Sequence, residues 1–225
     1  MIDLVIIKSA SSLCRATYAY PGDPRYIWDH FDDGDSDGVV WGAKKIDGLW
    51  RIALRGSVKL QDWIRDAEAL AVRCASLNGV TLHPGFNAGM QHTASEVSDL
   101  VGTDPWLACG HSLGAARADN LTAYAIKDGW PPIACIVFGE PKPGFRDFGD
   151  FVAEVPRVSF INQGTTGHDC VPDLPVRLIL EPYTWPSPLV ALDVTPPPFD
   201  GVDLFRFHHM QLYDPAVQLL TQSPA

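Results

Sequence analysis

A serine stands between two glycines in the stretch Gly110-His111-Ser112-Leu113-Gly114. The apolar run Trp106–Cys109 before it is typical of a buried strand, and Ala115–Lys127 after it has the composition and apolar spacing of a helix. A serine on so sharp a strand-to-helix turn has a strained backbone and an exposed hydroxyl, and a Cβ at either glycine would collide with a neighbouring element. The pattern favours Ser112 as a nucleophile, although a serine here could simply cap the helix.

A nucleophilic serine needs a histidine to take its proton, a carboxylate to orient that histidine, and donors for the developing oxyanion. On sheets with such a turn, the acid and then the histidine follow the serine in the chain. Asp169 comes after the predicted strand Val158–Ile161, and His208 and His209 lie near the C-terminus. The order serine, acid, histidine is therefore met.

Other acids compete with Asp169 for the orienting role. Asp173 is the weaker runner-up in the same segment, and Glu140 follows the strand after the serine turn, where a structural or positioning role suits it better. The acids expected on a helix surface are Asp147, Asp150 and Glu154.

The composition favours one globular domain over residues 1–225 with a large core, because 46% of the residues are hydrophobic. The net charge of −10 argues against nucleic acid as a partner and against electrostatic docking to an anionic membrane. No run is long enough to span a bilayer. Hydrophobic contact with lipid stays open.

The cysteines and the first residues predict a cytoplasmic protein. Five cysteines without paired spacing do not form a disulfide framework, and Cys109 and Cys135 fall in predicted buried strands. The segment Met1–Lys8 has an acidic residue where a signal peptide has a basic one, and its apolar run is short. Release without a leader, or carriage on a virion, stays open.

Strands alternate with helices along the chain, which predicts the α/β class with a mainly parallel central sheet and helices on both faces. Asp47-Gly48 is a hairpin signal between the first two strands. We expect helices over residues 2–20, 60–73, 86–101, 115–127, 145–153 and 210–220, and strands over 39–43, 49–54, 106–109, 133–138 and 155–161.

The segment Val171–Asp200 is dense in proline, which excludes helices and predicts loops and edge strands. It also carries Tyr183, Trp185 and Phe199. Two interpretations stay open: a loop packed on its own side chains, or an apolar rim beside the active site that would suit acyl chains.

Seven segments, in order between Val39 and Tyr213, resemble the class 3 lipases, the family of the fungal triacylglycerol lipases and feruloyl esterases. These segments are Ile52–Ser57, Asp62–Asp66, His83–Phe86, Gly110–Gly114, Val137–Gly144, Asp169–Pro175 and His208–Tyr213. Four of these segments are similar to named patterns of the family. In chain order the patterns are Asn-Trp-Ile-x-Asp of the lid helix, His-x-Gly-Phe, Thr-Phe-Gly-x-Pro-Arg-x-Gly and Asp-x-Val-Pro-x-Leu-Pro.

The resemblance implies an α/β-hydrolase fold and a serine esterase or lipase that cleaves lipid-like or acylglycerol esters without a cofactor or metal. It implies Ser112 as nucleophile and Asp169 as orienting acid. It also implies that Ser57 and Leu113 give their backbone N–H groups to the oxyanion. Residues 58–66 would be a mobile lid or a fixed helix, and transient contact with a lipid interface would follow from the former.

The histidine is chosen by alignment. Met210 and Tyr213 match a His-Ser-Met-x-x-Tyr pattern of bacterial relatives, which selects His208, whereas the closer spacing of the fungal lipases favours His209. We take His208 as the base.

Two other functions compete with ester hydrolysis. The chain could be a catalytically inactive binding protein on the hydrolase scaffold. It could also be a metal hydrolase, with ligands from His168, Asp169, Cys170, His208 and His209, although no pair has the usual zinc spacing.

Overall fold

The structure, a computed structural model, describes residues 2–19, 28–35, 37–57, 71–175, 183–196 and 207–224. The helices are α1 (Leu4–Ala16), α3 (Pro84–Asn87), α4 (Met90–Val101), α5 (Leu113–Asp128), α6 (Arg146–Val152) and α7 (Met210–Gln218), with 3₁₀ turns η2 (Ala75–Leu77) and η3 (Val171–Asp173). The strands are β1 (His30–Asp32), β2 (Trp41–Ile46), β3 (Leu49–Leu54), β4 (Val72–Cys74), β5 (Val80–Leu82), β6 (Trp106–His111), β7 (Cys135–Phe138), β8 (Arg157–Gly164), β9 (Gly167–His168) and β10 (Leu189–Asp193).

The main sheet has the order β1-β2-β3-β6-β7-β8-β10, with β9 paired to β8. The pairs from β3 through β10 along this order are parallel, and β1, β2 and β3 pair antiparallel at one edge. Asp47 and Gly48 connect β2 to β3 with φ of 52° and 78°, as a tight hairpin requires. The predicted hairpin and the mainly parallel sheet are confirmed.

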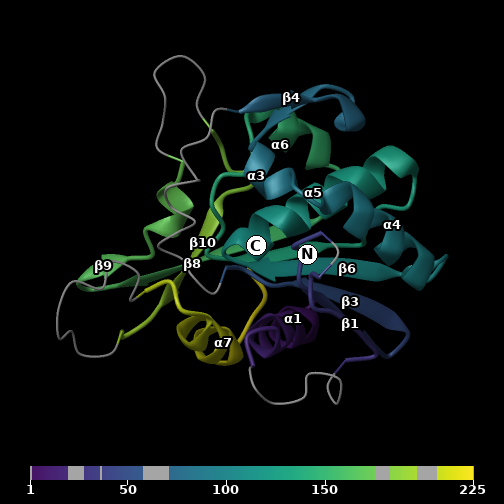
Figure 1. The fold of residues 1–225 in the computed structure, drawn as a ribbon. Coiled ribbons are helices and arrows are strands. Elements are labelled where there is room, and N and C mark those ends of the chain that lie inside the picture. The colour runs from purple at the N-terminus through teal and green to yellow at the C-terminus, as the bar shows by residue number, and fades with distance from the viewer. Residues whose placement is uncertain are drawn as a thin grey trace.

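Helices cover both faces of the sheet (Figure 1). On one face α1 and α7 lie side by side, and Asp214 of α7 accepts hydrogen bonds from Ser11 (3.0 Å) and Arg15 (3.2 Å) of α1. On the other face lie α3, α4, α5 and α6. A buried hydrophobic cluster fills each interface, so the sheet is held between two cores.

The helix expected over residues 86–101 is two helices. Gly89 separates α3 from α4 with a left-handed φ of 79°, and a Cβ there would lie 2.7 Å from the carbonyl oxygen of Asp37. The close approach of a neighbouring loop therefore requires glycine and interrupts the helix.

The helix expected over residues 60–73 is wrong at its end, and residues 60–70 lie outside the described part. Val72–Cys74 is a strand that pairs antiparallel with β5. Asn78 and Gly79, with φ of 57° and 81°, supply the turn between them. The turn at Asn78 and Gly79 therefore allows Val72–Cys74 to pair as a strand, although the residues of this segment are also compatible with a helix.

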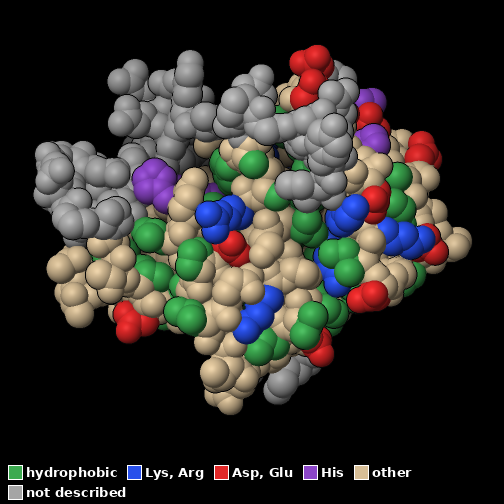
Figure 2. Space-filling view, turned by 90° about the horizontal axis from the view of Figure 1, so that it is seen from below, with side chains coloured by type: hydrophobic (Ala, Val, Ile, Leu, Met, Phe, Trp, Pro, Cys, Tyr) green, Lys and Arg blue, Asp and Glu red, His purple; other side chains and the backbone are tan. Residues whose placement is uncertain are grey.

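The face formed by α1 and α7 shows hydrophobic side chains in small groups among polar and charged ones (Figure 2). Val5 and Leu219 are exposed there at 72% and 81%. Within the described residues, no helix is both long enough and apolar enough to cross a bilayer.

Candidate active site

The carboxyl ends of the parallel strands align at one edge of the sheet. Leu54 of β3 is level with Gly110 of β6, and His111 of β6 is level with Phe138 of β7, which is level with Phe160 of β8. The residues that follow these strands, including the predicted nucleophile, oxyanion turn and acid, therefore meet at this edge.

Ser112 lies on a strained turn between β6 and α5. Its φ of 60° and ψ of −131° are unusual for a residue with a side chain and cost roughly 1–3 kcal/mol. A Cβ at Gly110 would lie 2.1 Å from the carbonyl oxygen of Gly114, and one at Gly114 would lie 2.1 Å from that of Leu54. The turn therefore needs both glycines, and the simple helix cap is ruled out because the Ser112 side chain caps no N–H group.

The predicted oxyanion donors both belong to segments that lie next to Ser112. Leu113 is the first residue of α5, and N–H groups in the first turn of a helix have no acceptor within it. Ser57 follows Gly56, whose hypothetical Cβ would lie 2.7 Å from Cβ of Ser112. The turn after β3 thus lies directly against the predicted nucleophile.

Asp169 and His208 are paired and buried. Nδ1 of His208 lies 2.7 Å from Oδ2 of Asp169, and the two side chains are 4% and 0% exposed. Gly139 leaves room for them, because its Cβ would lie 2.7 Å from that carboxylate oxygen and 3.0 Å from the imidazole. The carboxylate of Asp169 is therefore placed to orient the imidazole of His208.

Three hydrogen bonds keep the Asp169 carboxylate charged. His208 contributes one, the backbone N–H of Val171 donates to Oδ1 (2.9 Å), and the Tyr213 hydroxyl donates to Oδ2 (2.6 Å). Burial alone would raise the pKa of Asp169, but the charge of His208 and these bonds outweigh it and hold the pKa below its usual value.

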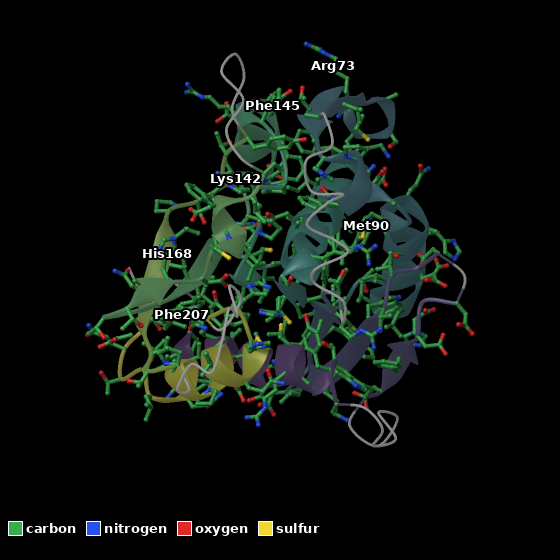
Figure 3. The ribbon with its side chains drawn as sticks, turned by 60° about the vertical axis from the view of Figure 1, so that its left-hand side comes forward. Arg73, Met90, Lys142, Phe145, His168 and Phe207 are labelled. Carbon is green, nitrogen blue, oxygen red and sulfur yellow. The ribbon has the colours of Figure 1, made fainter. Side chains whose placement is uncertain are left out.

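The sequence identifies Tyr213 only as part of a motif, and it misses Asn162. The Tyr213 hydroxyl also accepts the backbone N–H of Asn162 (3.1 Å), and the Asn162 amide donates to the carbonyl of Phe207 (2.7 Å). Figure 3 shows Phe207 beside the strands of the sheet and α7. These bonds fix the backbone immediately before His208.

The buried polar atoms without a hydrogen-bond partner in the described structure include Oγ of Ser112 and Nε2 of His208. Both flank the same turn, since the N–H of Ser112 donates to the carbonyl of Phe138 (3.0 Å) and His208 packs on Gly139. Most buried polar atoms are paired, and a catalytic role is one reason for a buried atom to lack a partner. His209, in contrast, is exposed at the start of α7.

The competing acids are engaged elsewhere. Glu140 is buried and accepts hydrogen bonds from Arg157 (2.5 Å) and Ser159 (3.1 Å), and burial raises its pKa. Asp173 is exposed and bonds His168 (2.9 Å). The expected helix-surface acids Asp147, Asp150 and Glu154 are exposed on or just after α6.

The ligand-type side chains of the metal hypothesis do not converge in the described structure. Among the described residues, the group of three side chains whose ligand atoms all lie within 4.8 Å of one another is Asp37, His92 and Glu96, and none of these belongs to that hypothesis. Asp169 and His208 are instead bonded to each other.

The proline-rich segment packs onto the domain where it is described. Tyr183 is buried against His83 and Phe145. The centroid of the Trp185 ring lies 4.9 Å from Nζ of Lys142. Lys142, labelled in Figure 3, also donates to the carbonyl of Asp173 (2.7 Å). Phe199 and the expected lid over residues 58–66 lie outside the described residues.

Removal of the Tyr213 hydroxyl tests the charge on Asp169. Because the folded-state pKa of Asp169 is lowered, it contributes stability above its unfolded pKa that is lost as the pH falls. We expect Tyr213→Phe to lower the free energy of unfolding by about 2 kcal/mol at pH 7, with a difference that shrinks as the pH falls below the unfolded pKa of about 3.9. Urea unfolding at a series of pH values measures both.

Tyr124→Phe is the matched control, since its buried hydroxyl bonds the uncharged Ser76 and Asn87 (2.9 and 3.3 Å). Its destabilisation should not change with pH. A Tyr213→Phe difference that is equally independent of pH would contradict this role.

The comparisons with known proteins identify the family of the chain. The family model described as Lipase (class 3) matches residues 51–178. A secreted mono- and diacylglycerol lipase of Fusarium solani is 30% identical over 152 residues, which are 64% of this chain and 44% of that protein. The chain thus spans less than half the length of this relative.

Solved lipases have the same fold. The Rhizomucor miehei lipase in complex with its propeptide has a TM-score of 0.65 at 19% identity, covering 77% of this chain and 63% of that one. The triacylglyceride lipase structure from the same organism has a TM-score of 0.67 at 17% identity, covering 84% and 80%. The predicted α/β-hydrolase fold is confirmed.

The predicted cytoplasmic location is contradicted, because the Fusarium solani relative is a secreted protein. The cysteines do not report the compartment. Cys14, Cys74, Cys109 and Cys135 are free and buried, and a buried thiol packs as a small apolar group in any redox environment.

Proposed function

Since the chain belongs to the class 3 lipase family, we propose that it is a serine carboxylic-ester hydrolase that cleaves acylglycerols or similar lipid-like esters. The observation that carries the proposal is the buried Asp169–His208 pair (2.7 Å) at the sheet edge where Ser112 occupies its strained turn. The similarity to an acylglycerol lipase supports the substrate class.

In the proposed first step, Oγ of Ser112 attacks the ester carbonyl while Nε2 of His208 takes the hydroxyl proton. The carbonyl electron pair moves onto oxygen, and the charged Asp169 stabilises the imidazolium. Collapse of the tetrahedral intermediate re-forms the carbonyl and breaks the bond to the alcohol, which leaves with the proton from His208. The acyl group remains on Ser112.

In the proposed second step, His208 takes a proton from water as the water oxygen attacks the acyl carbon. Collapse of this intermediate returns the proton to Ser112 and releases the carboxylic acid. The backbone N–H groups of Ser57 and Leu113 stabilise the oxyanion in both steps, and the loss of one such donor typically costs on the order of 3 kcal/mol of transition-state stabilisation.

We further propose that residues 1–225 form one domain and that the protein works outside the cell, as its Fusarium solani relative does. The placement of α1 and α7, from opposite ends of the chain, against one face of the sheet supports the single domain.

A panel of p-nitrophenyl esters from acetyl to palmitoyl tests the substrate class. We expect turnover of every soluble member, with kcat/KM rising with acyl length because longer chains bury more apolar surface. A jump in rate above the concentration at which the ester forms micelles would add interfacial activation to the proposal. Binding of the esters without release of p-nitrophenol would contradict hydrolysis and favour the inactive binding protein.

A further inference from the structure

A chain of hydrogen bonds runs behind Ser112 and joins three parts of the site. The hydroxyl of Tyr18, just after α1, lies 2.9 Å from the backbone N of Gly56 and 2.8 Å from Nδ1 of His111. On the other side of the ring, Nε2 of His111 lies 2.7 Å from the backbone carbonyl oxygen of His208. The oxyanion turn and the predicted base are thus connected through two side chains that the catalytic steps do not use.

The chemistry of the groups fixes the direction of each bond. A carbonyl only accepts, so Nε2 of His111 must carry the hydrogen. Burial lowers the pKa of His111 to about 3, so the ring is neutral at working pH and Nδ1 presents a lone pair. Tyr18 must therefore donate to Nδ1, and its oxygen accepts the N–H of Gly56.

The packing leaves little freedom in this arrangement. The ring of His111 stacks on that of His208, with centroids 4.6 Å apart and planes at 29°, and the ring of Tyr18 meets His111 edge-on at 5.5 Å. His111 is only 4% exposed. A Cβ at Gly56 would lie 2.4 Å from the Tyr18 hydroxyl and 2.7 Å from Cβ of Ser112, so the turn, Tyr18 and the nucleophile are in mutual contact.

We propose that Tyr18 and His111 are positioning residues that hold the oxyanion turn at Gly56-Ser57 and the backbone of His208 in register across Ser112. The inference rests on the proposed ester hydrolysis. It gives a role to the N-terminal segment, since Tyr18 lies before residues 51–178, which the family model matches. Because oxyanion donors and base act on opposite sides of one reacting carbon, an error of about 1 Å in their relative position can cost on the order of a hundredfold in rate.

Tyr18→Phe removes one hydroxyl and leaves the N–H of Gly56 and Nδ1 of His111 without their partner. We expect kcat for a soluble p-nitrophenyl ester to fall about 10- to 100-fold while KM stays within about twofold, since neither residue binds the substrate. Tyr124→Phe is the matched control. It also removes a buried hydroxyl that forms two hydrogen bonds, but this hydroxyl lies on α5 and bonds Ser76 and Asn87. Its kcat should stay within about twofold of the wild type.

Two substitutions of His111 separate the effects of the hydrogen bonds at Nδ1 and at Nε2 of its ring. In His111→Gln the amide nitrogen can take the place of Nε2 and donate to the carbonyl of His208, whereas His111→Leu keeps the bulk and loses both bonds. We expect kcat in the order wild type, His111→Gln, His111→Leu, with at least about a tenfold difference between the two variants. A residue that served only to fill space would give the opposite order or equal rates.

The thermal unfolding midpoint is recorded for every variant. A fall in kcat at unchanged KM in Tyr18→Phe, with an unaffected Tyr124→Phe of equal or lower stability, supports positioning. A wild-type kcat in Tyr18→Phe, or an equal fall in Tyr124→Phe, overturns it. The proposed function fails separately, if the wild-type protein itself neither hydrolyses the ester nor reacts with a fluorophosphonate.

Discussion

Ser112→Ala should lower kcat/KM for a short p-nitrophenyl ester by about 10⁵- to 10⁶-fold. The substitution removes the one atom that forms the acyl bond, and no other serine hydroxyl of the described structure lies on the strained turn next to the Asp169–His208 pair. Residual turnover would come only from the oxyanion donors acting on water. Initial rates at matched protein concentration measure the loss.

Ser11→Ala is the matched control. Ser11 is as buried as Ser112, but its hydroxyl bonds Asp214 between α1 and α7 (3.0 Å), on the opposite face of the sheet from α5. Its activity should stay within a few-fold of the wild type. Turnover that persists in folded Ser112→Ala would remove Ser112 from the mechanism.

His208→Ala should lose about as much activity as Ser112→Ala, because the base and the nucleophile act as one unit. His209→Ala, one residue along the chain, should stay within a few-fold of the wild type. Only His208 is buried and bonded to Asp169, whereas His209 is exposed. Assay of the two variants side by side decides between the alternatives that the sequence leaves open.

Both variants replace the same residue type in the same segment, so a general effect on folding would affect both. Near-ultraviolet circular dichroism of each variant tests whether it retains native packing. A large loss in His209→Ala with an active His208→Ala would reverse the assignment and require a different partner for Asp169.

Local patterns in the sequence predict most of the fold and the residues of the site. The serine turn, with its preceding strand and following helix, is specified by neighbouring residues, and so are the hairpin at Asp47-Gly48 and the acid after β8. The acid and the histidine that the order of serine, acid and histidine predicts, Asp169 and His208, are in contact in the structure.

Contacts between distant residues are not predictable in this way. Tyr18 and His111 are 93 residues apart, and Asp169 and Tyr213 are 44 apart, so no short pattern contains either bond. The break at Gly89 likewise depends on the backbone of Asp37 from another loop. The prediction of a cytoplasmic location was wrong because it rested on the cysteines and the first residues, and the packing of the fold does not tie either of them to a compartment.

The most direct test of the proposed mechanism is to find the residue that forms a covalent bond with an active-site reagent. The protein is incubated with a fluorophosphonate, and the modified peptide is identified by mass spectrometry. We predict one adduct per chain, on Ser112, formed much more slowly in His208→Ala and absent in Ser112→Ala. An adduct on any other residue, or an unmodified wild-type protein under conditions in which it hydrolyses esters, would contradict the account.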